Sequence, residues 1–449
     1  MTLAPAAFKA YDVRGLVPQQ LDEEGAYRLA RAYVEVFRPR RMAIGHDMRL
    51  TSPALAAAAI RGATDGGADV DVLGQIGTEM LYFAVAERGL DGGLIVTASH
   101  NPAEYNGMKI VREGARPVGE ASGLKELKRV ALGDDPLPPV GTPGDATAVD
   151  VLADYAAKVL SLVDASAIAP LRVVLDGGSG MAGTMLAPVL DALPIEAIPC
   201  FLEPDGAFPD HQPNPLLEEN RRFIVDKVRE HPGSIGIAWD GDADRCFFVD
   251  EEGLFVDGDF MTALIAEEVL RGDPGATILY DVRASLAVPE TVERCGGTAV
   301  VSRVGHAFIK VAMRDTGAAF GGEVSGHYYF RDFYGVDTGI LPALVVLQLV
   351  SRSGRTLHDL VQPLRDRYHI TGEINSQVAD VALKMQDLKD RYGPGGRVTH
   401  LDGISIEHGT WRFNVRPSNT EPLLRLNLEA TTAEEMVRRR DEVLEVIRS

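Results

Sequence analysis

Short apolar runs alternate with longer segments of helical pattern along the first part of the chain. Residues 42–45 and 69–73 are apolar runs typical of strands, and the alanine-rich segment 53–63 between them is typical of a helix. Strands that alternate with helices predict βαβ units, in which neighbouring strands run parallel. The pattern therefore predicts an α/β domain at the start of the chain.

The same alternation restarts twice. A strand pattern at 171–175 precedes a helix pattern at 181–193 and a strand at 234–239, and further strands follow at 277–280 and 298–302. The first strand of each unit ends at or beside an aspartate, namely Asp47, Asp176 and Asp281. A later strand of each unit runs into a polar loop, at 92–99, 233–240 and 320–325. If the units share one fold, these loops occupy equivalent positions and converge on one site.

The pattern changes after residue 366, where strand-like runs surround Ile404, Phe413 and Leu424 and an amphipathic helix pattern covers 433–447. A chain of 449 residues is too long for one ordinary core, and residues 134–145 have the Pro, Gly and Asp content of a linker. We therefore predict three related α/β domains with mixed, mostly parallel sheets and a smaller α+β domain. The expected boundaries are 1–147, 148–251, 252–366 and 367–449.

Composition narrows the class of protein. The formal net charge of −20 disfavours nucleic acid and anionic membranes as partners, and we expect neither. No apolar run is long enough for a membrane span, and the first residues lack the features of a signal peptide. Three cysteines without paired spacing support neither disulfides nor a zinc cluster, so a cytoplasmic location is expected.

The loop 97–102, Thr-Ala-Ser-His-Asn-Pro, follows the apolar run 93–96. Asn-Pro ends the strand, so Ser99 and His100 lie where a strand meets a loop, the usual place for chemistry in an open α/β sheet. An ordinary polar turn is the simpler alternative. Adjacent side chains at the end of a strand point in diverging directions, so we do not expect a Ser–His hydrolase pair here.

A second loop, Asp-Gly-Asp-Ala-Asp-Arg at 240–245, places three carboxylates at alternate positions after an apolar strand. Three such oxygens suit a hard cation such as Mg²⁺, which would also relieve their mutual repulsion. With Glu251, the three aspartates match positions 1, 3, 5 and 12 of an EF-hand loop. However, Arg245 stands where that loop needs glycine, and strand patterns flank it, so we reject calcium sensing.

The segment Gly-Ser-Gly-Met-Ala-Gly at 178–183 satisfies the dinucleotide-binding pattern GxGxxG between a strand and a helix. Glu203 or Asp205 could serve as the acidic residue that follows in such sites. An NAD-dependent dehydrogenase is therefore the candidate from a different class. A tight turn between strand and helix is the simpler explanation.

Two further loops carry polar groups suited to a phosphorylated sugar. Glu323 and Ser325, in the loop Gly-Glu-Val-Ser-Gly-His at 322–327, can bond vicinal hydroxyls. The segment Arg-Pro-Ser-Asn-Thr-Glu-Pro at 416–422, with Arg425 nearby, offers many donors to an anion such as phosphate. Each loop alone could equally be an ordinary polar turn.

Together these four loops resemble those of the α-D-phosphohexomutase family, and they occur in the family's order. Residues 8–15, Phe-Lys-Ala-Tyr-Asp-Val-Arg-Gly, match its N-terminal signature, so the resemblance covers the whole chain. It implies four domains in a heart shape around a central cleft. It also implies an isomerase that interconverts hexose 1-phosphate and hexose 6-phosphate through a phosphoserine and a 1,6-bisphosphohexose, which also serves as activator.

The resemblance assigns Ser99 as the residue that carries the phosphoryl group. With that phosphate, Asp240, Asp242 and Asp244 are the implied ligands of one Mg²⁺ per chain. The implied acid–base and electrostatic helpers are His100, Lys109 and Arg245. The implied substrate-binding residues are Tyr11, Arg14, Arg283, His306, Glu323, Ser325, His327, Arg416, Ser418, Asn419, Thr420 and Arg425.

The serine loop most resembles those of phosphomannomutases and of dual phosphomannomutase/phosphoglucomutases, so hexose phosphates are the expected small-molecule partners. Asn419 supports this, since the glucosamine branch usually has glycine there. Two residues depart from the pattern, because Val324 stands where the mannose branch often has Met and Arg283 where many members have Lys. Phosphoglucosamine mutase therefore stays an alternative. A monomer or weak homodimer is expected.

Overall fold

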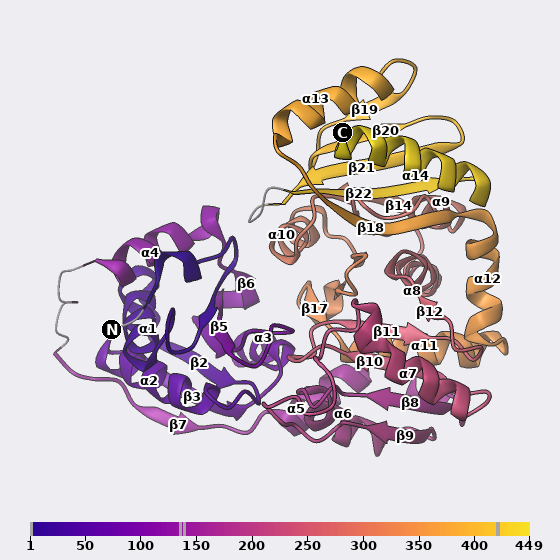
Figure 1. The fold of residues 1–449 in the computed structure, drawn as a ribbon. Coiled ribbons are helices and arrows are strands. Elements are labelled where there is room, and N and C mark those ends of the chain that lie inside the picture. Colours follow the sequence, from indigo (N-terminus) through magenta and orange to yellow (C-terminus); the bar gives the residue numbers. More distant parts are fainter. Residues whose placement is uncertain (1–2, 134–136, 138–140, 419–422) are drawn as a thin grey trace.

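The computed structural model describes residues 3–133, 137, 141–418 and 423–449, which form four successive sheets with their helices (Figure 1). The first sheet has the order β1-β5-β4-β2-β3-β7, with β6 paired to β5. Its strands are β1 (Asp12–Leu16), β2 (Arg41–His46), β3 (Asp69–Gln75), β4 (Gly92–Val96), β5 (Tyr105–Arg112), β6 (Arg116–Pro117) and β7 (Ala146–Ala148). Its helices are α1 (Glu23–Phe37), α2 (Ser52–Asp65), α3 (Thr78–Glu87) and α4 (Leu124–Leu132).

The second and third sheets have the orders β12-β11-β10-β8-β9 and β14-β13-β15-β16-β17. The second unit contains α5 (Leu152–Ser161), β8 (Arg172–Asp176), α6 (Ala182–Leu190), β9 (Glu196–Cys200), α7 (Glu218–Glu230), β10 (Ile235–Trp239), β11 (Cys246–Val249) and β12 (Phe255–Val256). The third contains α8 (Gly258–Gly272), β13 (Thr277–Asp281), α9 (Ala287–Arg294), β14 (Thr298–Ser302), α10 (His306–Thr316), β15 (Phe320–Gly322), β16 (Tyr328–Phe330), β17 (Val336–Thr338), α11 (Ile340–Ser353) and α12 (Leu357–Arg367).

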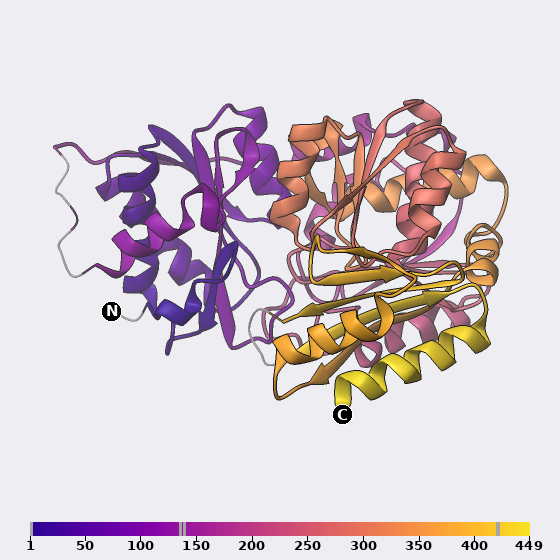
Figure 2. The same ribbon diagram turned by 90° about the horizontal axis from the view of Figure 1, so that it is seen from above.

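The fourth unit is α+β, as predicted. Its antiparallel sheet, β18-β22-β21-β20-β19, is covered on one face by two helices that lie side by side (Figure 2). Its elements are β18 (His369–Gln377), α13 (Val381–Tyr392), β19 (Arg397–Thr399), β20 (Ile404–Glu407), β21 (Trp411–Pro417), β22 (Leu423–Ala430) and α14 (Ala433–Arg448). Short 3₁₀ turns occur at Pro5–Ala7, Glu113–Ala115, Glu120–Ser122, Ala165–Ala167 and Arg331–Phe333.

The α/β class and the mixed sheets are confirmed, but "mostly parallel" is too strong. Within the described chain, the first sheet has three parallel and three antiparallel pairings, and the second and third have two of each. Except for β1, which pairs with the distant β5, the antiparallel neighbours in these three sheets follow each other in sequence and are joined by loops too short to carry a crossover helix. Strands β4 and β10 are buried along their whole length, which explains their unbroken apolar runs.

The three aspartates at the strand ends make one and the same turn. Asp47 accepts a hydrogen bond from the backbone N–H two residues later at 3.0 Å, Asp176 does so at 3.0 Å, and Asp281 at 2.8 Å. Aspartate favours such turns because its side chain can replace a backbone acceptor. The internal repeat predicted from the sequence is thus visible at the level of single hydrogen bonds.

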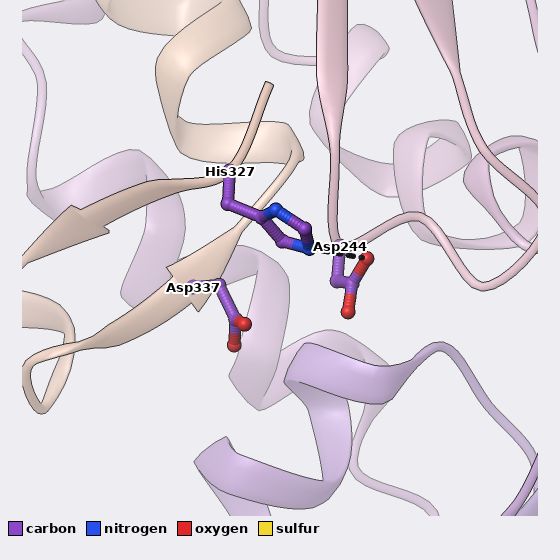
Figure 3. Close-up of side chains that lie close together, drawn as sticks. All are labelled: Asp244, His327 and Asp337. Atoms are coloured by element: carbon purple, nitrogen blue, oxygen red, sulfur yellow. Dashed lines mark ion pairs between the residues drawn. The ribbon is translucent and has the colours of Figure 1, made fainter. Parts of the chain in front are cut away.

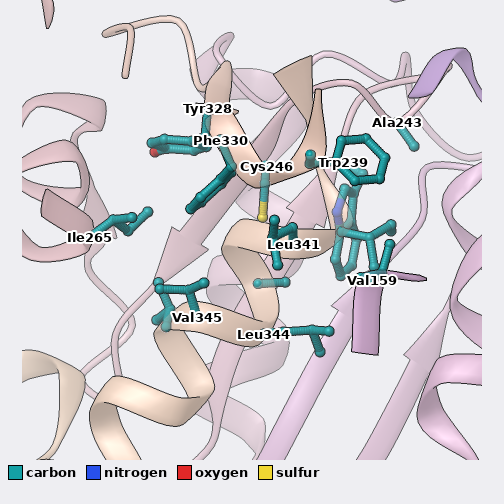
Figure 4. Close-up of a cluster of buried hydrophobic side chains, with 14 of the residues drawn as sticks. Val159, Trp239, Ala243, Cys246, Ile265, Tyr328, Phe330, Leu341, Leu344 and Val345 are labelled. Atoms are coloured by element: carbon teal, nitrogen blue, oxygen red, sulfur yellow. The ribbon is translucent and has the colours of Figure 1, made fainter. Parts of the chain in front are cut away.

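The largest hydrophobic core crosses the boundaries between the first three units. Val159, Trp239, Phe330 and Leu344, from the second and third units, belong to one buried cluster (Figure 4). The indole N–H of Trp239 donates to the carbonyl of Gly339 at 2.8 Å. A shared, closely packed core resists relative movement of the units that build it.

A buried carboxyl group also connects the three units. Glu79 on α3 accepts a hydrogen bond from Tyr155 on α5 and, at 2.6 Å, from the backbone N–H of Gly339, just after β17. Burial raises the pKa of Glu79 to about 8. One side chain thus has partners in three successive units.

The predicted linker lies only partly within the described residues, because 134–136 and 138–140 fall outside them. After it, β7 pairs with β3 and extends the first sheet. The four domain boundaries stay predictions, as do the heart shape and the central cleft. None of the described helices is both long enough and apolar enough to cross a membrane.

Candidate active site

The serine loop is shaped by a buried arginine. Ser99 follows β4 with a left-handed backbone (φ 52°), and its N–H donates to Thr97 Oγ1 at 2.9 Å. The buried guanidinium of Arg49 donates to four carbonyl oxygens of this loop and the start of β5 at 2.6–2.9 Å, those of Ser99, Asn101, Pro102 and Tyr105. These bonds supply partners for carbonyls that leave the sheet, so the loop keeps one conformation.

The prediction that the Ser99 and His100 side chains diverge is wrong. Ser99 Oγ lies 3.0 Å from His100 Nδ1. The left-handed backbone at Ser99 breaks the alternation of an extended strand and turns the two side chains to the same side. Partial burial and the charges of Arg245 and Arg14 hold the pKa of His100 well below its usual range, so the ring is neutral.

The acidic loop between β10 and β11 meets the serine loop. Ser99 Oγ donates to Asp240 Oδ2 at 2.8 Å, and the Nε of Arg245 donates to the same oxygen at 2.9 Å. The ammonium of Lys109, on β5, contacts Asp242 Oδ2 at 2.6 Å and also contacts Asp244. Residues 133 or more positions apart in the sequence are therefore brought together.

The three carboxylates of this loop suit a divalent cation. They are buried, and each offers an oxygen within 4.8 Å of the others. The Oδ1 atoms of Asp242 and Asp244 are buried and have no hydrogen-bond partner in the described structure. Burial, with the negative charges of Asp244 and Asp242, raises the pKa of Asp240 to about 7. Buried carboxylate oxygens that lack hydrogen-bond partners are the kind of ligand that hard divalent cations prefer.

The loop 322–327, expected from the sequence to bind the sugar and called the sugar-recognition loop below, lies beside the acidic loop. His327 Nε2 is 3.7 Å from Asp244 Oδ1 (Figure 3), and Ser325 Oγ is 3.0 Å from His327 Nδ1. Glu323 accepts from the N–H of Gly305 at 2.9 Å and from the hydroxyl of Tyr329 at 2.7 Å. Burial, with the negative charge of Asp281, raises the pKa of Glu323 to about 7.

Two aromatic contacts connect this loop to the N-terminal signature. The ring of His306 is stacked on that of His327 at 6.1 Å between centroids, and the edge of Tyr11 meets His306 at 5.3 Å. Arg14, on β1, donates to Asn101 Oδ1 at 2.9 Å and is ion-paired with Asp12 at 2.8 Å. Residues of the first and third units thus line one continuous polar region.

The two arginines expected to bind phosphate, called the cradle below, lie on β21 and β22. Arg416 and Arg425 face each other across these strands, and both contact Glu373 of β18. The N–H of Ser418 donates to the carbonyl of Leu423 at 2.9 Å. Asn419 and Thr420, also predicted to bind substrate, lie outside the described residues.

Arg283 connects the cradle to the sugar-recognition loop. It is paired with Asp281 at 2.9 Å, and its guanidinium lies 3.8 Å from Glu323 and 3.7 Å from Glu373. A chain of polar contacts therefore runs from Ser99 through the acidic loop and the sugar-recognition loop to Arg416.

Five residues of this network were not predicted from the sequence. Thr78 donates to Asp242 Oδ2 at 2.5 Å, and Lys310 contacts Asp337 at 2.8 Å and His306 at 3.2 Å. Arg49 and Glu373 complete the set. Of these, only Arg49 could have been suspected from the sequence, because it follows Asp47, one of the recurrent strand-end aspartates. The other four come close to the site only through the packing of the units against one another.

The glycine-rich turn 178–183 does not form a free anion cradle. The N–H of Ser179 donates to Phe201 O at 2.8 Å and that of Met181 to Gly241 O at 2.9 Å, so donors that a pyrophosphate would need are already used. A Cβ on Gly180 would lie 2.6 Å from the carbonyl of Gly241. The glycines instead allow this turn to pack against the acidic loop, which argues against the dehydrogenase alternative.

We expect the Arg49→Ala variant to be destabilised by about 3–5 kcal/mol, because it leaves the buried Asp47 carboxylate without its cation and four carbonyls without donors. Denaturant unfolding monitored by circular dichroism measures this. Arg61→Ala, a change on the exposed face of α2, is the control and should stay within about 0.5 kcal/mol of the natural protein. Equal stability of both variants would contradict the role given to Arg49.

Comparison with known proteins covers almost the whole chain. Models of the phosphoglucomutase/phosphomannomutase family match residues 5–131 (alpha/beta/alpha domain I), 153–253 (domain II), 257–368 (domain III) and 373–446 (C-terminal domain). The chain belongs to the phosphoglucomutase/phosphomannomutase family. It is therefore a phosphohexomutase, an isomerase that acts on hexose phosphates, as the resemblance implied.

Individual relatives agree with the family. The phosphohexomutase described here is 43% identical over 424 residues to a protein described as phosphohexose mutases of Xanthomonas campestris pv. campestris (strain B100), covering 94% of each chain. It is 43% identical over 432 residues to a phosphomannomutase of Escherichia coli, again covering 94% of each. The crystal structure of a phosphoglucomutase/phosphomannomutase family protein from Burkholderia thailandensis matches with a TM-score of 0.89 and 30% identity, covering 99% of this chain and 97% of that one.

Proposed function

We propose that this phosphohexomutase interconverts the 1- and 6-phosphates of mannose, and also of glucose, through a phosphoserine at Ser99 and a 1,6-bisphosphohexose intermediate. One observation carries the proposal: Ser99 Oγ contacts Asp240 at 2.8 Å. The serine that follows β4 is thereby in direct contact with the acidic loop. Phosphoryl transfer needs its charge neutralised where the bond breaks, and the acidic loop is where a cation would do so.

In the first half-reaction, the bond between phosphorus and Ser99 Oγ breaks as a new bond forms to the free hydroxyl of the hexose phosphate. The hydroxyl proton passes to a nearby base, and Ser99 takes up a proton as it leaves. The neutral His100, 3.0 Å from Ser99 Oγ, can exchange that proton. The second half-reaction repeats these steps in reverse with the other phosphate of the intermediate, so Ser99 is phosphorylated again.

Mg²⁺, held by Asp240, Asp242, Asp244 and the phosphate on Ser99, would supply Lewis-acid stabilisation of the transferring group. Two basic residues lie next to these aspartates. Arg245 and Lys109 offset the charge of the acidic loop, and Lys109 reaches Asp242 and Asp244 from β5. Their positive charges also attract the anionic substrate to an acidic protein.

The remaining site residues would bind the substrate. Glu323 and Ser325 face the sugar hydroxyls in this proposal, with Tyr11, Arg14, Arg283, His306 and His327 around them. Arg416, Arg425 and the segment from Ser418 to Thr420 hold the phosphate that does not react. Enzymes can accelerate the cleavage of phosphate monoesters by up to about 10²¹-fold. A site that accelerates transfer to a sugar hydroxyl would also accelerate transfer to water, so it has to exclude water. The four domain boundaries, a cytoplasmic location and a monomer or weak homodimer belong to this proposal as well.

Rates with mannose 1-phosphate, glucose 1-phosphate and glucosamine 1-phosphate test the substrate class. Mannose and glucose differ only at the 2-hydroxyl, and contacts to positions 3 and 4 do not distinguish them, so we expect kcat/KM values within about tenfold. We expect glucosamine 1-phosphate to react at least about tenfold more slowly, because it brings into the site a positive charge that has to be desolvated, where mannose and glucose have a neutral hydroxyl. Coupled assays with the bisphosphate activator and Mg²⁺ measure these rates. Preference for glucosamine 1-phosphate would favour the phosphoglucosamine mutase alternative.

A further inference from the structure

The carboxylate of Glu373 lies between the two arginines of the cradle. Arg416 Nη2 is 2.8 Å from one carboxylate oxygen and Arg425 Nη1 is 2.7 Å from the other. The two arginines are direct cross-strand neighbours, so their like charges repel each other. Glu373 therefore bridges and neutralises the pair in the way that a bound phosphate would.

The backbone aims Glu373 at this position. The pairing of β18 with β22 is irregular between Ile370 and Glu373, and Gly372 in this bulge has φ 66°. The hydroxyl of Thr371 accepts the N–H of Leu428 at 3.1 Å, which anchors the bulge to β22. A bulge shifts which side chains face a given side of the sheet. The bulge in β18 therefore determines that the Glu373 side chain points toward the two arginines.

The arginines are not saturated by this contact. The Nε atoms of Arg416 and Arg425 are buried and have no hydrogen-bond partner in the described part of the chain. Arg283 adds a third positive charge 3.7 Å from Glu373. Burial raises the pKa of Glu373, but Arg283, Arg416 and Arg425 more than offset this and hold it below its usual value. An ionised carboxylate therefore lies beside two guanidinium groups whose hydrogen-bonding capacity it does not exhaust.

We propose that Glu373 competes with the phosphate of the substrate for Arg416 and Arg425, and so keeps that phosphate weakly enough bound to leave during turnover. This inference rests on the proposed function, in which the bisphosphate releases one phosphate from these arginines and presents the other. As a phosphate departs, the carboxylate supplies the counter-charge, so release does not leave two adjacent guanidinium groups unpaired. Glu373 acts through the arginines and is a positioning residue.

The test measures binding of inorganic phosphate to the full-length protein by isothermal titration calorimetry. In the Glu373→Gln variant we expect phosphate to bind about 3–10-fold more tightly, because one negative charge near the bound anion is removed. We expect KM for hexose 1-phosphate to fall, and kcat to fall at least about threefold, because release becomes slower. A purely structural role for Glu373 would instead weaken phosphate binding and raise KM.

Two comparisons make the outcome specific. In an Arg416→Gln background, Glu373→Gln should tighten phosphate binding by a smaller factor than in the natural protein, because one of the two contested arginines is gone and only Arg425 remains. Glu429→Gln is the matched control, since Glu429 also lies in the fourth unit and accepts from the N–H of Leu286, at 3.1 Å, in the third. It should leave phosphate affinity unchanged. An equal or larger gain in the Arg416→Gln background, or tighter binding in Glu429→Gln, would overturn the proposal.

Unchanged or weaker phosphate binding by Glu373→Gln would also overturn it. If that variant fails to fold, Glu373→Asp replaces it. The shorter side chain reaches the two arginines less well, so this variant should also bind phosphate more tightly, by a smaller factor because the negative charge remains. The binding assay needs no turnover. Absence of mutase activity in the natural protein would therefore refute the proposed function, whereas normal activity with unaltered phosphate binding in the variants would refute only the role of Glu373.

Discussion

Ser99→Ala is expected to lower the mutase rate at least about a thousandfold, because the hydroxyl that accepts and returns the phosphoryl group is removed. The purified natural protein should carry a covalent phosphate, visible as about 80 Da of added intact mass, that maps to Ser99. The variant should lack it. Coupled assays of hexose 1-phosphate conversion and intact mass spectrometry measure the two effects.

A serine elsewhere in the first unit provides the control. Ser122, which is exposed and caps Gly119 in a 3₁₀ turn, can be replaced by alanine without touching the site. That variant should keep both the phosphate and the activity. Full mutase activity in Ser99→Ala would eliminate the phosphoserine mechanism, whatever the control shows.

Removal of the divalent cation is expected to have an effect of similar size. Dialysis against a chelator should abolish turnover, and added Mg²⁺ should restore it. Asp242→Asn should weaken Mg²⁺ binding, measured by calorimetry, at least about 10–100-fold, because one of three buried carboxylate ligands loses its charge. The rate at saturating substrate should then depend on Mg²⁺ over a correspondingly higher concentration range.

Asp205→Asn is the matched control, because Asp205 is exposed and lies outside the acidic loop. It should leave the Mg²⁺ requirement unchanged. It also addresses the dehydrogenase alternative, in which Asp205 would contact a ribose. Full activity after chelation, with no response to added Mg²⁺, would refute a metal site at residues 240–244.

The positions of the candidate chemistry could be predicted from the sequence because each follows a recognisable strand end. The apolar run before Ser99 and the one before Asp240 are buried strands, and their loops do meet. The local geometry could not be predicted in the same way. A left-handed serine gives no signal in residue type, and it turns His100 toward Ser99 against the expectation for an extended strand.

Residues that act across units were also beyond prediction. Glu373 lies in a strand with no motif, and its partners Arg416 and Arg425 are 43 and 52 positions away. Thr78 and Asp242 are 164 positions apart. Such contacts depend on how the sheets are placed against one another, which depends on packing over large areas. The proportion of antiparallel strands was underestimated for a related reason, since strands as short as two or three residues carry little periodic pattern.

The small strand β7 has a consequence for how the enzyme can open. Strand β7 is paired with β3 and ends at Ala148, and α5 begins at Leu152. Only three residues therefore connect the first sheet to the first helix of the second unit. Three residues reach at most about 10 Å. Substrate entry by a wide swing of the first unit would have to strip β7 from its sheet. The fourth unit is connected to the third by the single residue Tyr368, but it has a hydrophobic cluster of its own and meets the third unit through polar contacts such as that between Arg283 and Glu373, so its movement would disrupt less of the shared core.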